Sequence, residues 1–198
     1  MELWVADVAT NTARRLLATP LNDAFGSAFE WVSDSQTLLA RTVPAGRGAA
    51  PAADATPTGP AVQETGGGKK SGARTYQDLL KNPADERTFE YYATAQLVRV
   101  QLADGSAQPL GQPGVIQTAS PSPDGQLRAG AHPRTGRYSY TLPVSSFPQR
   151  LDVLDLVTGG VVKTIADLPL ADNVPTNFDA VPTGPRDHAW RADAPATI

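Results

Sequence analysis

The sequence predicts an all-β protein, and three observations support this fold class. Short apolar runs alternate with polar turns along most of the 198 residues. Glycine and proline are plentiful, with 17 and 18 residues, as expected of a chain with many turns. A strand that ends in a turn carrying aspartate recurs along the chain, which indicates an internal repeat.

The first predicted elements are two pairs of strands within residues 1–43. Residues 3–8 have two fairly apolar faces, as in a buried strand, and a polar turn leads from them to a second strand at 13–17. The second pair is predicted at 28–31 and 37–43, again with a polar turn between the strands.

Residues 44–74 differ in composition from the sequence on either side. They are rich in proline, glycine, alanine and threonine, and they include three consecutive glycines at 66–68. Almost no large apolar side chain occurs among them, so burial cannot offset the entropy lost on ordering. We therefore predict a flexible, disordered insertion.

Residues 75–94 are expected to form two short helices. The first begins at Thr75, whose spacing to Asp78 fits a capping box in which aspartate replaces the usual glutamate. The second follows Asn82, which precedes a proline in the pattern of an N-cap and a first helical residue. Two acidic residues then suit the positive end of that helix.

The β pattern resumes at residue 95 and continues to residue 187. Residues 95–102 alternate between two faces, and the Asp104-Gly105 pair after them is a strong hairpin signal. A short strand at 107–110 completes the predicted hairpin.

A further set of strands follows the same plan. Strands are predicted at 115–120, 151–156 and 161–165, with polar turns between them. Residues 127–137 are mostly small and polar, so no regular strand is expected there. Residues 188–198 are expected to begin one more strand.

The turn aspartates give the length of the repeat. Asp34, Asp124 and Asp193 each follow the first strand of a unit, at intervals of 90 and 69 residues. Without residues 44–91 the first interval falls to 42, which lies within the roughly 40–50 residues of familiar propeller repeats. The sequence therefore predicts a partial β-propeller of about two to three four-stranded blades.

The predicted strands are too few to close a ring, since a propeller has roughly four to eight blades. Residues 1–43 would hold a partial blade and the start of the next, and residues 95–187 the remaining blade strands. Residues 188–198 would start a truncated blade. An open stack leaves strand edges unpaired, so we expect a piece of a larger propeller.

Composition argues against several function classes. The formal net charge of −3 and the scattered basic residues give no reason to expect a nucleic-acid partner. No apolar run approaches the roughly 20 residues of a membrane span, so no membrane partner is expected. Cysteine is absent, which excludes disulfides and thiolate metal sites. No cofactor is expected, and the cellular compartment stays open.

No catalytic or metal-binding group is predicted. The sequence lacks a Gly-x-Ser-x-Gly element, which would form the nucleophile elbow of an α/β-hydrolase. The two histidines, His132 and His188, have no partner set that suggests a metal site or a triad. The repeated aspartates are expected to cap their turns. Trp31 and Trp190 are expected to pack between blades.

Several stretches carry a family resemblance. The most specific is Arg74-Thr75-Tyr76-Gln77-Asp78-Leu79-Leu80. Others are 89–97, Ser122-Pro123-Asp124-Gly125, Tyr138-Ser139-Tyr140 and Trp190-Arg191-Ala192-Asp193. Together they resemble the propeller of glutamyl endopeptidases, the chloroplast enzyme and its bacterial relatives, within the prolyl oligopeptidase family of serine peptidases.

This resemblance implies a non-catalytic segment of a two-domain serine peptidase that cleaves after glutamate. The implied partners are a C-terminal α/β-hydrolase domain, which would carry the catalytic triad beyond Ile198, and a peptide substrate. The propeller would cover the active site and restrict access to it. By charge alone, Arg134, Arg137 and Arg150 are candidate contacts to an acidic substrate. The alternative is a stand-alone propeller that binds a protein partner.

Overall fold

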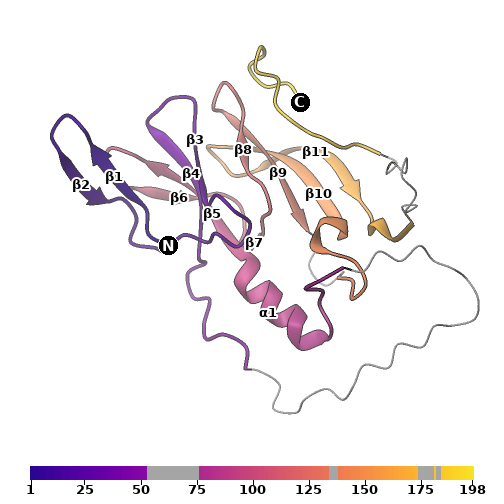
Figure 1. Ribbon diagram of the computed structural model, residues 1–198. Coiled ribbons are helices and arrows are strands. Elements are labelled where there is room, and N and C mark those ends of the chain that lie inside the picture. The colour runs from indigo at the N-terminus through magenta and orange to yellow at the C-terminus, as the bar shows by residue number, and fades with distance from the viewer. Residues whose placement is uncertain (53–75, 134–137, 174–180, 182–183) are drawn as a thin grey trace, which may run out of the picture.

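The computed structural model describes residues 1–52, 76–133, 138–173, 181 and 184–198 (Figure 1). Most of its regular structure is antiparallel β, as expected of the all-β class, and one α-helix accompanies the strands. The strands are β1 (Trp4–Asp7), β2 (Thr12–Arg15), β3 (Phe29–Trp31), β4 (Thr37–Thr42), β5 (Thr94–Gln101), β6 (Ala107–Pro109), β7 (Gly114–Val115), β8 (Ser120–Pro121), β9 (Leu127–Pro133), β10 (Gln149–Asp155) and β11 (Val161–Leu168). The helical elements are α1 (Pro83–Ala93) and the 3-10 turns η1 (Val144–Ser146) and η2 (Ala171–Asn173).

The strands form three sheets that succeed one another along the chain. The N-terminal hairpin consists of β1 and β2 alone. The first sheet has the order β3-β4-β5-β6, with β7 also paired to β5, and the second sheet has the order β8-β9-β10-β11. Each four-stranded path therefore runs up and down in chain order, and the long connection of each sheet lies between its second and third strands (Figure 1).

The hairpin turns before the last strand of each sheet share one backbone conformation. Each turn contains a residue in the left-handed region: Asn11 before β2, Gly105 before β6 and Gly159 before β11, with φ of 53°, 75° and 71°. A Cβ on Gly105 would lie 2.3 Å from the carbonyl oxygen of Leu16, and one on Gly159 would lie 2.6 Å from the backbone nitrogen of Gly111. The turn of one sheet thus touches the backbone just after the last strand of the preceding sheet, at both junctions.

The register extends this equivalence to the buried leucines. Leu3 lies eight residues before Asn11, and Leu97 lies eight residues before Gly105; they are bonded to Leu16 and Leu110, each the residue just after the next strand. The Leu16 N–H donates to the Leu3 carbonyl at 2.8 Å, and the Leu110 N–H donates to the Leu97 carbonyl at 2.9 Å. All four side chains are buried. The N-terminal hairpin therefore occupies the place of the third and fourth strands of a four-stranded unit.

Two apolar clusters fill the junctions between the sheets. The first lies between the N-terminal hairpin and the first sheet, and includes Leu3, Leu16, Leu38, Val98 and Val100. The second lies between the first and second sheets, and includes Leu39, Leu97, Leu110, Ile116 and Leu156. Successive residues of β4 thus contribute to different clusters, because strand side chains alternate between faces.

The strand predicted at residues 3–8 is present as β1, but the prediction that it is buried is wrong. Leu3 is buried, but every residue of β1 is exposed or only half-buried, and Trp4 is 56% exposed. The reason is tertiary, because no described element covers the Trp4 face of this hairpin.

One of the two expected helices is present. Asn82 caps α1, since its Oδ1 accepts hydrogen bonds from the N–H groups of Ala84 and Asp85, both at 2.9 Å. Residues 76–80 are not helical. Asp78 has a φ of 56°, in the left-handed region, which a right-handed helix does not permit. Thr75 and the rest of 53–75 lie outside the described residues, so the flexible insertion stays a prediction.

The expectation that no regular strand forms at 127–137 is wrong for its first seven residues. Strand β9 covers Leu127–Pro133, pairing along its whole length with β10 and at one end with β8. Ladders on both edges stabilise a strand through the backbone alone, whatever its side chains. In contrast, residues 188–198 contain no strand, although the Arg191 N–H bonds the Thr197 carbonyl at 2.8 Å.

Candidate functional site

Two of the repeated aspartates bind their own turns. Asp34 accepts two backbone N–H groups of its turn at 2.9 and 2.8 Å and the Thr37 hydroxyl at 2.6 Å. Burial acts to raise the pKa of Asp34, but these hydrogen bonds to the carboxylate outweigh it and lower the pKa. Asp124 accepts the Ser122 hydroxyl and the Gln126 N–H, which lower its pKa too. The predicted capping role is confirmed for both, and neither carboxyl is set up as an acid catalyst.

The third aspartate is bound differently. Asp193 receives the Arg191 guanidinium at 2.6 and 2.9 Å, and this interaction lowers the pKa of Asp193. Trp190 nearby donates its indole N–H to the Ser120 carbonyl in β8 at 2.9 Å. This contact places Trp190 against the second sheet. The expectation of packing between sheets does not hold for Trp31, which is 52% exposed.

A buried arginine joins the first sheet to the chain that leads into the second. Arg41 lies on β4 and is only 6% exposed. Its guanidinium donates to the carbonyls of Ile116 and Gln117 at 2.9 Å, of Phe25 at 3.2 Å, and of Ser27. Burial lowers the pKa of Arg41, but an arginine keeps its charge in proteins. Four carbonyl dipoles replace the lost water around this charge.

Sequence reasoning did not single out Arg41. The available signal was a lone charge inside the apolar strand Thr37–Thr42, which is unusual unless the charge has partners. A cavity of about 140 Å³ adjoins Arg41 and Glu30. Burial raises the pKa of Glu30, and the Arg41 charge opposes that rise. The Arg41 guanidinium thus links the first sheet to backbone carbonyls of two other segments.

An aromatic cluster joins the long connections of the two sheets to the segment before β3. Phe89 of α1 packs edge-to-face on Phe25, Tyr138 and Phe147, with ring centroids 6.3, 5.4 and 6.2 Å away. Tyr138 and Phe147 lie 5.5 Å apart. Aromatic pairs in such geometry add roughly 0.5–1.5 kcal/mol each beyond their buried area. The cluster therefore fixes α1 against the second sheet.

Carboxylates of α1 extend this contact. The Tyr138 hydroxyl donates to Oε1 of Glu90 at 2.5 Å. Desolvation and the neighbouring carboxylates of Glu86 and Asp85 raise the pKa of Tyr140. Asp85 and Glu86 lie in the first turn of α1, where the helix dipole favours negative charge. These groups orient the connection of the second sheet.

The described start of the insertion is also attached to α1. The Arg47 guanidinium lies over the rings of Tyr91 and Tyr92, 4.1 and 5.4 Å from their centroids. It also donates to the Tyr91 carbonyl, and the Tyr91 hydroxyl donates to the Gly48 carbonyl at 2.9 Å. Residues 44–52 are thus fixed at their contact with the helix.

Of the three arginines predicted to contact an acidic substrate, the structure describes only Arg150. Arg134 and Arg137 lie outside the described residues. Arg150 lies on β10 and binds Asp152 through Nε at 3.0 Å and the Thr164 hydroxyl through a terminal nitrogen at 2.9 Å. Asp152 also accepts the Thr164 hydroxyl at 2.6 Å. Arg150 thus has partners within the second sheet, and its substrate role stays a prediction.

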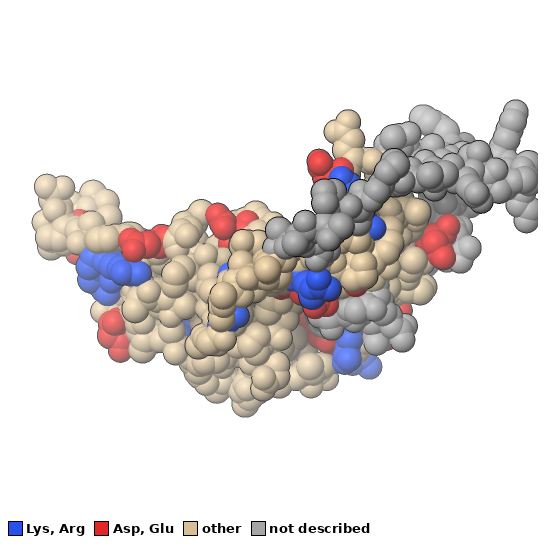
Figure 2. Space-filling view, turned by 90° about the horizontal axis from the view of Figure 1, so that it is seen from below, with Lys and Arg blue, Asp and Glu red and all other residues tan. Residues whose placement is uncertain are grey.

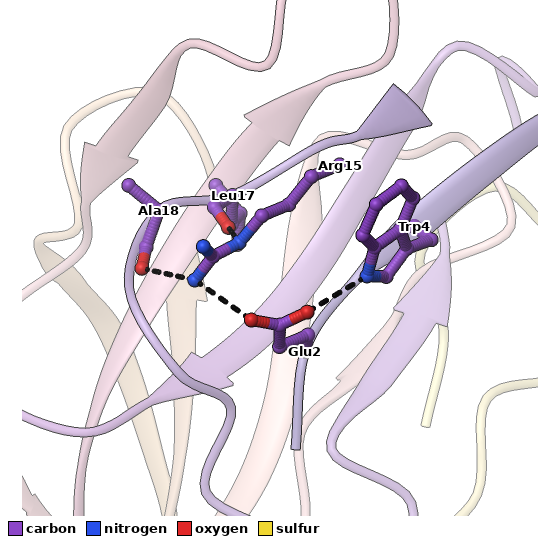
Figure 3. A network of polar contacts seen from close by, with 5 residues as sticks. All are labelled: Glu2, Trp4, Arg15, Leu17 and Ala18. Atoms are coloured by element: carbon purple, nitrogen blue, oxygen red, sulfur yellow. Dashed lines mark hydrogen bonds and ion pairs between the residues drawn. The ribbon is translucent and has the colours of Figure 1, made fainter. Parts of the chain in front are cut away.

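A smaller polar network connects the start of the chain, the N-terminal hairpin and the residues that follow β2 (Figure 3). Glu2 accepts the indole N–H of Trp4 at 2.9 Å and lies 3.3 Å from a terminal nitrogen of Arg15. Arg15 in turn donates to the carbonyls of Leu17 and Ala18, both at 2.8 Å. All of this lies near the surface, where an ion pair contributes at most about 1 kcal/mol.

The described residues were compared with the charge patterns, ligand clusters and apolar helices of common functional sites. Figure 2 shows acidic and basic side chains scattered over one face, without a continuous basic area. Within the described ranges, no group of three or more potential metal ligands comes together. In the same ranges, no helix has the length and apolar character needed to cross a bilayer.

Comparisons with known proteins agree with the resemblance read from the sequence. The chain is 40% identical over its whole length to a probable chloroplastic glutamyl endopeptidase of Oryza sativa subsp. japonica. It is 38% identical over 99% of its length to the protein of the same description from Arabidopsis thaliana. The chain spans about a fifth of the length of these curated relatives. No protein-family model matches the sequence.

Proposed function

We propose that this chain is a non-catalytic propeller segment of a serine endopeptidase that cleaves after glutamate. By sequence the chain belongs to the glutamyl endopeptidases, of whose length it spans about a fifth. In this proposal the segment covers the active site of an α/β-hydrolase domain that lies elsewhere in a longer chain. It limits entry to peptide substrates that are short or unfolded. The names of the two relatives support the peptidase assignment.

The observation that carries the proposal is the repeated sheet junction. Two successive four-stranded meanders, preceded by a hairpin in the place of a half-unit, follow the strand pattern of propeller blades. Gly105 and Gly159 make the same close contact with the sheet before them. A repeat of this kind generates a ring or stack when more units are added.

An indirect role in catalysis fits the chemistry of the described residues. Asp34 and Asp124 are committed to turns, and Arg41 is committed to backbone carbonyls. Positioning and exclusion are then what the segment contributes. Contacts from Arg134, Arg137 and Arg150 to an acidic substrate form part of the proposal, on charge alone.

The first test uses the chain by itself. Purified protein should show no hydrolysis of glutamyl peptide substrates and no labelling by a serine-directed fluorophosphonate. Turnover that the fluorophosphonate abolishes would contradict the proposal.

The gating role needs a longer chain with both the segment and a hydrolase domain. Removal of the segment should raise the hydrolysis of a large unfolded protein relative to that of a short glutamyl peptide. An unchanged ratio in an enzyme that still cleaves the short peptide would argue against gating.

A further inference from the structure

One edge of the N-terminal hairpin has no partner strand in the described part of the chain. Strand β1 pairs with β2 alone. Its equivalent in the first sheet, β5, pairs on that second edge with β4 along six residues. In the second sheet, β10 pairs with β9 along seven residues. The other two strands in the place of β1 are therefore paired on both sides.

The hydrogen-bond pattern shows which groups face this free edge. The Leu16 N–H donates to the Leu3 carbonyl, so Leu3, Val5 and Asp7 exchange hydrogen bonds with β2. Antiparallel ladders alternate from residue to residue. The N–H and C=O groups of Trp4 and Ala6 therefore point away from β2, into the free edge.

The first sheet gives the buried counterparts of these residues. By register, Trp4 corresponds to Val98 and Ala6 to Val100, two residues that pair with β4 and are buried. Trp4 itself is 56% exposed. The difference lies in the surroundings, because the same positions become buried once a strand and a neighbouring sheet are present.

A cleft lies beside the same strand. It has a volume of about 670 Å³ and is lined by β1 residues Val5 and Ala6 and, from the first sheet, by Gln36 and Leu102. Arg14 borders it and donates to the carbonyls of Leu102 and Ala103. The hairpin is thus held to the first sheet on one side of the cleft, while the edge of β1 stays free.

We propose that the free edge of β1 receives a β-hairpin from another part of a longer chain, in the register in which β4 pairs with β5. This inference rests on the proposed stacking of equivalent sheets. The nearer incoming strand runs antiparallel to β1 and hydrogen-bonds Trp4 and Ala6. It completes a four-stranded unit and continues the interface already formed by the first apolar cluster. The relatives, about five times as long, have ample chain to supply it.

The chain itself provides a probe for this edge. Residues 29–42 contain β3, its turn and β4, and these strands fill the equivalent place beside β5. Thr42 lies opposite Gln96, whose counterpart is Glu2. A copy of 29–42 can therefore be joined to Met1 by a short glycine-serine linker. The copy carries Arg41→Thr, so that no guanidinium is buried without carbonyl partners.

The fused chain should be more stable than the chain alone. We expect an increase in Tm of about 4 °C or more, since 1 kcal/mol corresponds to about 2–4 °C at this size. Amide exchange of Trp4 and Ala6 should slow at least about tenfold. Protection of these two amides reports directly that a strand pairs with the free edge of β1.

Two proline variants provide a matched pair. Ala6→Pro removes an N–H that faces the free edge, whereas Ala13→Pro removes an N–H that faces the opposite edge of the hairpin. Both leave the β1–β2 ladder intact. The fusion should raise Tm in the Ala13→Pro background and not in the Ala6→Pro background.

The results of these experiments distinguish a hairpin of a longer chain from a second copy of this chain as the partner of the β1 edge. A fusion that gives no increase in Tm and no added protection would overturn the proposal. So would a concentration-dependent dimer of the unfused chain that Ala6→Pro dissociates, because a second copy would then be the occupant. Neither result affects the sheet junction at Gly105, so failure of this inference is distinguishable from failure of the stacked-sheet arrangement.

Discussion

The junction between the N-terminal hairpin and the first sheet makes a sharp prediction for Gly105→Ala. Gly105 has a φ of 75°, and an added Cβ would lie 2.3 Å from the Leu16 carbonyl oxygen. The left-handed backbone alone costs alanine roughly 1 kcal/mol. Forcing the sheets apart to relieve the overlap costs roughly 1–3 kcal/mol more, the range typical of overpacking. The expected loss of unfolding free energy is therefore about 2–4 kcal/mol.

Gly26→Ala is the matched control for this substitution. Gly26 has a φ of 81°, but an added Cβ would have no atom within 4 Å. Its loss should be only about 1 kcal/mol, because it has the backbone strain without the overlap. Urea unfolding followed by far-UV circular dichroism gives both free energies. Equal losses for Gly105→Ala and Gly26→Ala would refute the close packing of sheet against sheet.

The remaining predictions concern single contacts. Arg41→Met should cost roughly 2–4 kcal/mol in urea unfolding, since four buried or partly buried carbonyls lose their donor; a cost under about 0.5 kcal/mol would show that these bonds contribute little. Asn82→Ala should cost about 1 kcal/mol and loosen α1, seen as faster amide exchange of Asp85; unchanged exchange would contradict the cap. The folded pKa of Asp34 lies below its unfolded value of about 3.8, so its contribution is present above that pH and is lost as pH falls through the folded pKa. Melting curves from about pH 5 to pH 2.5 should show a steeper fall in Tm for the wild type than for Asp34→Asn, and parallel curves would disprove the linkage.

Local signals in the sequence predicted the hairpins, because turn chemistry and alternation act over a few residues. Asp104-Gly105 forms the expected turn, and Asn82 caps the expected helix. The same local logic failed at Asp78, where a capping spacing was present but the backbone took a left-handed conformation. A spacing of two residue types does not specify φ.

What escaped prediction depends on contacts between sheets. Trp4 has the apolar character of a buried strand, yet whether it is buried depends on a neighbouring sheet. Arg41 is a single charge whose four carbonyl partners come from segments up to 76 residues away. The equivalence of Leu3 and Leu97 needed the strand register, because the insertion hides their spacing in the sequence.

The central claim is that this chain forms consecutive propeller units beside the active site of a peptidase. The most direct measurement is a crystal structure of a full-length glutamyl endopeptidase that contains this segment. The account predicts that β3–β6 and β8–β11 form adjacent blades around one axis, that a strand pairs with β1, and that the blades lie over the catalytic serine. Sheets that close face to face as a sandwich, or a segment remote from that serine, would contradict it.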